Sequence, residues 1–250
     1  MLFTAPDISD YISGVILFDE TIRQATNDGV PFAEYLTSLG IVPGIKVDKG
    51  AKDLPMHPGE KVTEGLDGLR ERLEEYYSLG ARFAKWRAVI EIGDNQPSMA
   101  CIDVNAHALA RYSALCQEAK MVPIVEPEIL MDGNHSIETC FEVTTKVLDH
   151  VFKVLEDQKV ALNGIILKPN MVISGTDASD RADVATVATA TVKCLSENVP
   201  DEVPGIAFLS GGQTSEEATA HLSAMNEMGP HPWQLSVSYT HLTLPTILLV

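Results

Sequence analysis

Short apolar runs alternate with longer amphipathic stretches along the chain. Seven short runs have the composition and length of buried β-strands: 14–18, 43–48, 82–90, 122–130, 164–168, 205–210 and 233–239. Helical periodicity separates most of them. One apolar stripe consists of Leu66, Leu69, Leu73 and Tyr76 and predicts a helix that stops at Gly80, and another consists of Val143, Val147, Val151 and Leu155. Strands that alternate with helices predict a parallel sheet with right-handed crossovers.

The repeat of strand and helix favours a (β/α)8 TIM barrel. Such a barrel needs eight strands, and the pattern supplies seven, so we predict an incomplete barrel. An open doubly wound sheet is the alternative, but no G-x-G-x-x-G fingerprint follows the first strand. Charged residues also follow several different strands, as in barrel active sites, whereas an open sheet would gather them at one switch point.

Charged side chains lie two positions apart near the ends of three predicted strands, and a fourth predicted strand ends in a single lysine. Successive strand residues point to opposite faces, so Lys85 and Arg87 share one face and Trp86 takes the other. In a barrel, four positive and three negative side chains would meet at one end: Lys46, Lys85, Arg87 and Lys168 with Asp48, Glu126 and Glu128. In a chain with a net charge of −17, this balance suits a phosphorylated ligand. A structural layer of ion pairs in the barrel core is the other interpretation.

Lys168 ends an apolar run, where its ammonium is costly to desolvate and the neutral amine is favoured. A neutral amine adds to a carbonyl and forms an imine, which serves as an electron sink for breaking or forming an adjacent C–C bond. Glu126 is then a candidate proton shuttle. A lysine that merely extends its charge to solvent from a strand end is the alternative.

The segment "FLSGGQTSEEA" predicts a phosphate cradle after a strand. Gly211 and Gly212 allow backbone N–H groups to approach an anion, and Thr214 and Glu217 have the spacing of a capping box at a helix start. A glycine-rich turn without a ligand is the alternative. The string "LSGGQ" also occurs in ABC transporter ATPases, but no upstream G-x-x-x-x-G-K-[ST] loop accompanies it here.

Composition excludes several classes of partner and cofactor. The strongly negative charge argues against nucleic acid and anionic membranes, and no run of 18 apolar residues predicts a membrane span. The four cysteines have no C-x-x-C spacing and the histidines no metal-binding spacing, so we expect reduced thiols, no metal site and no cofactor. His107, His150 and His221 fall on helical patterns and are expected to be surface or packing residues.

The motifs "GVILFDET", "GIKVDKG", "FAKWR", "IVEPEIL", "LKPNMV" and "FLSGGQ" occur in an order and spacing that closely resemble class I fructose-bisphosphate aldolase, the metal-independent Schiff-base enzyme. The resemblance covers residues 2–239. It implies a lyase that cleaves fructose 1,6-bisphosphate reversibly to glyceraldehyde 3-phosphate and dihydroxyacetone phosphate, in glycolysis, gluconeogenesis or the Calvin cycle. It also implies an eight-stranded barrel and a homotetramer.

The resemblance implies a role for each matched residue. Lys168 forms the Schiff base, Glu126 is the general acid and base, Glu128 tunes the neighbouring lysine, and Lys85 positions hydroxyls and stabilises charge during cleavage. The residues that it implies for substrate binding are Lys46 at the distal phosphate, Arg87 beside Lys85, and Ser210, Gly211, Gly212 and Ser238 at the other phosphate.

The chain also departs from the family pattern at both ends. The family has an earlier strand with a catalytic aspartate, which this sequence lacks. The family continues "SYGR" after the last strand, whereas this chain has Thr240 in place of the glycine and no arginine after it. We therefore expect residues 1–239 to form strands 2 to 8 of the barrel and residues 240–250 to be an unrelated tail. The chain alone is expected to be inactive, which leaves a catalytically dead or partner-binding scaffold as the alternative function. A cytoplasmic or plastid location is expected.

Overall fold

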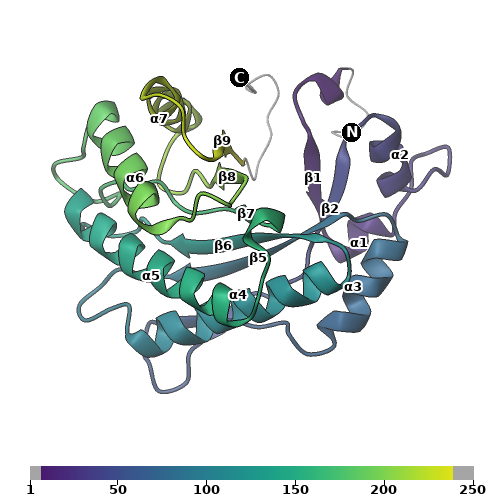
Figure 1. Ribbon diagram of the computed structural model, residues 1–250, viewed down its shortest axis with the longest axis horizontal. Coiled ribbons are helices and arrows are strands. Elements are labelled where there is room, and N and C mark those ends of the chain that lie inside the picture. Colours follow the sequence, from purple (N-terminus) through teal and green to yellow (C-terminus); the bar gives the residue numbers. More distant parts are fainter. Residues whose placement is uncertain (1–6, 239–250) are drawn as a thin grey trace.

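The sheet is a curled layer of seven parallel strands. The computed structural model describes residues 7–238. The strands follow one another in the order β1-β2-β5-β6-β7-β8-β9, with every neighbouring pair parallel. Their bounds are Gly14–Leu17, Val42–Lys46, Phe83–Ile90, Val122–Ile129, Ile166–Leu167, Gly205–Phe208 and Gln234–Val237. Figure 1 shows the curl, with helices on its outer side.

Helices connect the strands and cover the outside of the sheet (Figure 1). Their bounds are Asp19–Ile22 (α1), Phe32–Ser38 (α2), Leu69–Ser78 (α3), Met99–Glu118 (α4), Ile137–Asp157 (α5), Val184–Asn198 (α6) and Ser215–Glu227 (α7), with short 3-10 turns at Ile8–Asp10 (η2) and Leu162–Gly164 (η3). The starts of α4 to α7 are fixed by side chains that accept a hydrogen bond from a first-turn N–H: Ser98, Ser136, Asp183 and Thr214. Capping of this kind typically contributes about 1 kcal/mol to a helix.

Strand β5 shows how the sequence directs side chains to the two faces. Trp86 is fully buried on the helix side, where its ring lies 5.6 Å from that of Tyr112 in α4. Lys85 and Arg87, one position before and after, point to the opposite face, as the period of two predicts. The outer face of the strand therefore builds the core, and the inner face is left for polar side chains.

The predicted barrel pattern is confirmed, with differences at particular elements. All seven predicted strands form, but β7 contains only Ile166 and Leu167. Helix α3 begins at Leu69 because Gly68 before it has a left-handed conformation, with φ of 63°, so Leu66 is not part of the helix. A two-stranded hairpin, β3 (Ala51–Asp53) and β4 (Lys61–Thr63), was not predicted.

Strands β1 and β9 are the two ends of the sheet order. Within residues 7–238 they do not pair with each other, so the barrel is not closed there. The predicted unrelated tail, 240–250, lies outside the described residues. No helix in the described part of the chain has the length and apolarity needed to cross a membrane. All four cysteines are buried and free, as expected.

Candidate active site

The candidate site lies where the C-terminal halves of four neighbouring strands meet. Strands β2, β5, β6 and β7 are parallel, and their register places Lys46 beside Lys85 and Arg87 beside Glu126. Lys168 follows β7 directly. Parallel strands present their carboxyl ends at one edge of the sheet, so the register alone brings these side chains together.

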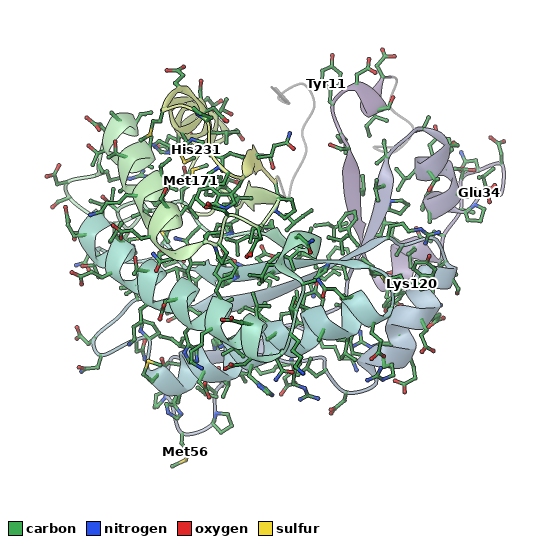
Figure 2. The ribbon with its side chains drawn as sticks, in the orientation of Figure 1. Tyr11, Glu34, Met56, Lys120, Met171 and His231 are labelled. Carbon is green, nitrogen blue, oxygen red and sulfur yellow. The ribbon has the colours of Figure 1, made fainter. Side chains whose placement is uncertain are left out.

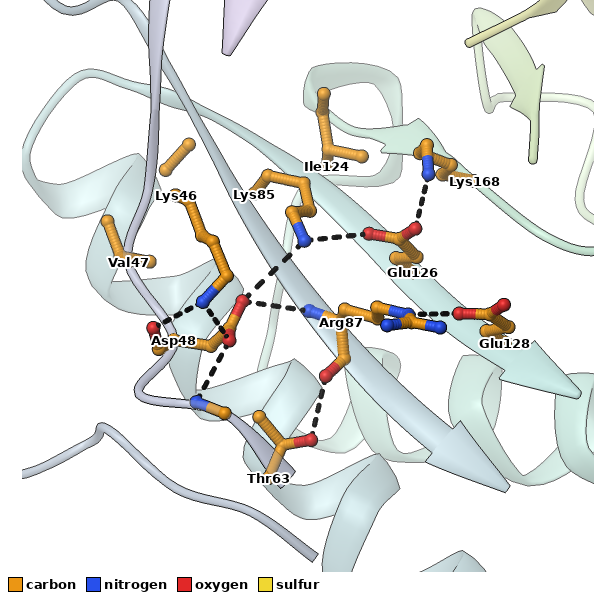
Figure 3. A network of polar contacts seen from close by, with 12 residues as sticks. Lys46, Val47, Asp48, Thr63, Lys85, Arg87, Ile124, Glu126, Glu128 and Lys168 are labelled. Carbon is orange, nitrogen blue, oxygen red and sulfur yellow. Dashed lines mark hydrogen bonds and ion pairs between the residues drawn. The ribbon is translucent and has the colours of Figure 1, made fainter. Parts of the chain in front are cut away.

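Glu126 is a buried carboxylate shared by two lysines (Figure 3). The Lys168 Nζ donates a hydrogen bond to Oε1, and the Lys85 Nζ lies 3.3 Å from Oε2. The side chains of Glu126 and Lys168 are 4% and 6% exposed, so water screens this contact very little. Proton exchange between Glu126 and Lys168 or a molecule bound between them is therefore geometrically available.

Asp48 holds Lys46 and Lys85 from the other side. Its Oδ1 accepts a hydrogen bond of 2.6 Å from Lys46, and its Oδ2 lies 3.7 Å from the Lys85 Nζ. Backbone N–H groups of Gly50 and Arg87 also donate to the carboxylate, at 3.1 and 3.4 Å. These contacts fix the orientation of Asp48, and Lys85 lies between the carboxylates of Asp48 and Glu126.

Arg87 and Glu128 form a separate ion pair next to Glu126 (Figure 3). The hydrogen bond to Glu128 raises the pKa of Arg87 above its ordinary value, so the guanidinium stays charged. A Cβ built on Gly211 would lie 3.4 Å from Glu128 Oε1, which places this carboxylate against the glycine-rich turn. Because Arg87 compensates the charge of Glu128, an anion can approach the turn at lower electrostatic cost.

Lys168 is held in place by its own backbone and by a neighbour that sequence reasoning missed. Its N–H donates to the Val125 carbonyl at 2.7 Å. Two residues later, the buried Asn170 accepts from the Ile129 N–H at 3.2 Å and donates to Thr144 Oγ1 at 3.1 Å. Asn170 thereby ties the end of β7 to β6 and α5. An amide directly after an apolar strand and "KP" was the available signal.

The glycine-rich turn after β8 has the predicted form. The capping box between Thr214 and Glu217 is present and starts α7. The Gln213 N–H donates to the Ser210 carbonyl at 3.1 Å and closes the turn. Among the described residues, no hydrogen bond occupies the N–H groups of Gly211 and Gly212. These two donors are free to bind an anion at the start of a helix.

The structure brings the predicted charged residues into one connected group. Figure 3 shows Lys46, Asp48, Lys85, Glu126 and Lys168 linked by ion pairs, with the Arg87–Glu128 pair beside them. Ser238 lies just after β9, and its N–H donates to the Phe208 carbonyl at 2.8 Å. It therefore lies beside β8, the strand that leads into the glycine-rich turn.

The histidines lie outside this group. His107 is exposed, His150 pairs with Asp103 across α4 and α5, and His221 is buried with its Nδ1 2.6 Å from Gln213 Oε1. In residues 7–238, no group of three or more His, Cys, Asp and Glu side chains has the arrangement of a metal site.

Comparison with known proteins points to one family. The chain matches the family model described as Fructose-bisphosphate aldolase class-I over residues 1–248. It is 64% identical to a probable fructose-bisphosphate aldolase class 1 of Xanthomonas axonopodis pv. citri, over 96% of this chain and 72% of that protein. It is 51% identical to the cytosolic fructose-bisphosphate aldolase 4 of Arabidopsis thaliana, over 96% of this chain and 61% of that protein.

A solved structure shows the same fold. A fructose-bisphosphate aldolase from Plasmodium falciparum, crystallised in complex with TRAP and a small molecule inhibitor, superimposes with a TM-score of 0.91 at 49% identity. The likeness covers 94% of this chain and 69% of that chain.

Proposed function

Because the chain belongs to the class I fructose-bisphosphate aldolases, lyases that cleave fructose bisphosphate in glycolysis, we propose that its own Lys168 and Glu126 carry that reaction. The observation that carries the proposal is the buried contact between Lys168 and Glu126, with Lys85 as the second partner of the same carboxylate. A nucleophilic amine and a carboxylate that exchanges protons with it are the two groups that imine chemistry needs.

In the proposed reaction, Lys168 acts as the nucleophile. Its neutral amine attacks the ketone carbon of fructose 1,6-bisphosphate, water leaves, and a protonated imine forms. The bond between the third and fourth carbons then breaks, and its electron pair moves into the imine to give an enamine. Glyceraldehyde 3-phosphate leaves, the enamine carbon takes up a proton, and hydrolysis of the imine releases dihydroxyacetone phosphate. The imine itself is the electron sink, so the proposed chemistry needs no cofactor.

Glu126 and Lys85 manage protons and charge in this sequence. Glu126 accepts the proton of the hydroxyl group on the fourth carbon during cleavage and returns one to the enamine carbon. Lys85, 3.3 Å from the Glu126 carboxylate, stabilises negative charge as it develops on the oxygen of the leaving aldehyde. Glu128 assists by holding Arg87 beside this group.

A lysine side chain and the backbone N–H groups of the glycine-rich turn suit the two phosphates of the substrate. Lys46, 26% exposed and paired with Asp48, is proposed to bind the distal phosphate. Gly211 and Gly212, with Ser210 and Ser238, are proposed to bind the phosphate next to the ketone.

Deuterium exchange on dihydroxyacetone phosphate tests this proposal through half of the reaction. In deuterated water the chain should exchange the proton on the carbon that becomes the enamine, as followed by proton NMR. Glu126→Gln should slow this exchange about 100-fold or more, the usual effect of losing a general base. Glu60→Gln is the matched control, since Glu60 is also a buried carboxylate but contacts Ser98. Equal exchange in the Glu126 variant would contradict the assignment.

The wider setting of the chain follows the family. We propose that residues 14–237 supply seven strands of an eight-stranded barrel and that the assembled protein is a homotetramer. A cytoplasmic or plastid location is proposed, supported for the cytosol by the Arabidopsis relative. A catalytically dead or partner-binding scaffold of the same fold is the second candidate. Strands β1 and β9, which each pair on one side only within residues 7–238, favour it for the chain by itself.

A further inference from the structure

Arg181 reaches from one connecting loop to the glycine-rich turn of the next. It lies between β7 and α6, and its Nη2 donates to the Gly212 carbonyl at 3.2 Å. Its Nη1 lies 3.6 Å from Glu217 Oε1. The other oxygen of Glu217 accepts from the Thr214 N–H at 2.8 Å, and this hydrogen bond lowers the pKa of Glu217. Arg181 therefore binds the turn and the carboxylate that caps the helix after it.

The loop that carries Arg181 is itself fixed. Three backbone N–H groups of this loop donate to carbonyls of the loop between β6 and α5: Gly175 to His135, Thr176 to Met131, and Asp177 to Gly133, at 2.8 to 2.9 Å. The Ala182 N–H, next to Arg181, donates to Ser174 Oγ at 3.2 Å. Because its loop is held in this way, Arg181 can fix the position of the glycine-rich turn that it contacts.

The carbonyl that Arg181 holds belongs to the peptide unit that sets the shape of the turn. The Gly212 carbonyl is bound by Arg181, and the Gln213 N–H of the same peptide is bound by Ser210. With both sides of this peptide occupied, its plane cannot rotate without losing two hydrogen bonds. Among the described residues, the N–H groups of Gly211 and Gly212, just before this peptide, donate to no acceptor.

We propose that Arg181 is a positioning residue for phosphate recognition by this turn. It fixes the Gly212–Gln213 peptide and with it the turn that carries the two free N–H groups, and its charge offsets the carbonyl dipole that would otherwise repel an anion. The proposal rests on the function proposed above, since it assumes that the turn binds the phosphate next to the ketone. The proposal therefore predicts that Arg181 affects the binding of phosphorylated ligands but not imine formation itself.

Borohydride trapping with two ligands separates these effects. Dihydroxyacetone phosphate and dihydroxyacetone form the same imine, but only the first carries a phosphate. Arg181→Met should raise the half-saturating concentration of dihydroxyacetone phosphate about tenfold, as expected for one charge-assisted hydrogen bond. It should leave the trapping of dihydroxyacetone unchanged. Arg181→Lys, which keeps a cationic donor, should recover part of the loss.

Lys193→Met is the matched control, because Lys193 is an exposed cation on α6 whose recorded ion pair is with Glu197, one helical turn away. This substitution should leave the trapping of both ligands unchanged. Unaltered saturation by dihydroxyacetone phosphate in Arg181→Met would overturn the proposal, and so would an equal loss for both ligands.

A failure of the proposed function gives a different result. If the unsubstituted chain traps neither ligand, the imine chemistry itself is wrong, and so is a role for Arg181 in it. If it traps both ligands at the same concentration, Lys168 keeps its assigned role, and the phosphate role of the turn and of Arg181 is refuted.

Discussion

Asp48 is the residue on which the positive side of the site depends. Its side chain is 3% exposed and compensates both Lys46 and Lys85. Asp48→Asn keeps the shape but leaves two cations without this partner. Removal of one member of a buried ion pair typically costs about 3–5 kcal/mol, and because Lys46 is partly exposed we expect a loss of ~3 kcal/mol.

Urea unfolding at neutral pH measures this loss. Asp157→Asn is the control, because Asp157 pairs with Lys153 on the exposed face of α5. Its loss should change the free energy of unfolding by less than about 0.5 kcal/mol. Similar effects of the two substitutions would show that Asp48 does not organise the lysines.

The sequence alone predicts those site residues whose positions follow from the alternation of side chains along a strand. Lys85 and Arg87, or Glu126 and Glu128, are two apart on long strands, so their common face could be predicted before any contact was known. Asn170 and Arg181 could not be found in this way. Their roles depend on hydrogen bonds to Ile129 and Gly212, partners 41 and 31 positions away, and no periodic pattern encodes such pairs.

At the scale of elements, the turn after β8 requires glycine at one position. Gly212 has φ of 73°, and a Cβ there would lie 2.6 Å from the Cβ of Met131. Gly212→Ala should therefore lower the free energy of unfolding by more than about 1 kcal/mol and weaken the binding of dihydroxyacetone phosphate.

Gly29→Ala is the matched control, since Gly29 has φ of 82° but a Cβ there meets nothing within 4 Å. It carries the same backbone strain without the collision. Both losses are measured by urea unfolding, and equal losses in the two variants would show that the contact with Met131 does not matter.

His221, in α7, makes the stability of the protein depend on pH. Burial lowers the pKa of His221 below its ordinary value of 6.5, the Arg181 charge lowers it further, and the Glu217 charge opposes the shift. The neutral ring faces Gln213. His221 binds a proton at a higher pH in the unfolded chain than in the folded chain. The contribution of the neutral ring to the free energy of unfolding is therefore complete above about pH 6.5 and is lost as the pH falls below that value.

Unfolding of the wild-type chain and of His221→Gln between pH 7.5 and 5 tests this dependence. The variant should lose less stability over this range than the wild-type chain does. His107→Gln, on the exposed face of α4, should behave as the wild-type chain. A wild-type slope in His221→Gln would show that other groups cause the acid sensitivity.

Elements with long periodic patterns were predictable, and short ones were not. Strands β5 and β6 each span eight residues; β5 alternates between buried and more exposed positions, and β6 is buried at every position after Val122. The hairpin strands β3 and β4 have three residues each, and β3 is exposed along its whole length, so neither carries a hydrophobic signature. Figure 2 shows Met56, between these two strands, pointing away from the rest of the molecule.

At the scale of the whole molecule, the open sheet predicts self-association. Within residues 7–238, the apolar strand β1 ends the sheet on one side and β9 on the other, and an unpaired strand edge is a template for pairing with another chain. We expect the 250-residue chain to be poorly soluble and not to turn over fructose 1,6-bisphosphate. Light scattering and a cleavage assay measure both properties. A monodisperse chain that cleaves the substrate rapidly would contradict this expectation.

The barrel architecture was predictable because one repeated unit determines it. Each strand and helix pair has the same pattern, so the parallel order of the seven strands follows from their succession. The exception is the step from β2 to β5, where the hairpin intervenes without entering the main sheet. Closure of the proposed barrel needs an eighth strand between the two ends of the sheet, and no local pattern within the seven strands specifies it.

The central claim is that Lys168 is the nucleophile, and peptide mapping of a trapped adduct tests it most directly. The chain is treated with dihydroxyacetone phosphate and sodium borohydride, digested, and examined by mass spectrometry. We predict a reduced adduct on the peptide that contains Lys168, its loss in Lys168→Met with an unchanged circular dichroism spectrum, and its retention in Lys193→Met. An adduct that persists in Lys168→Met, above all one on Lys85, would contradict the claim.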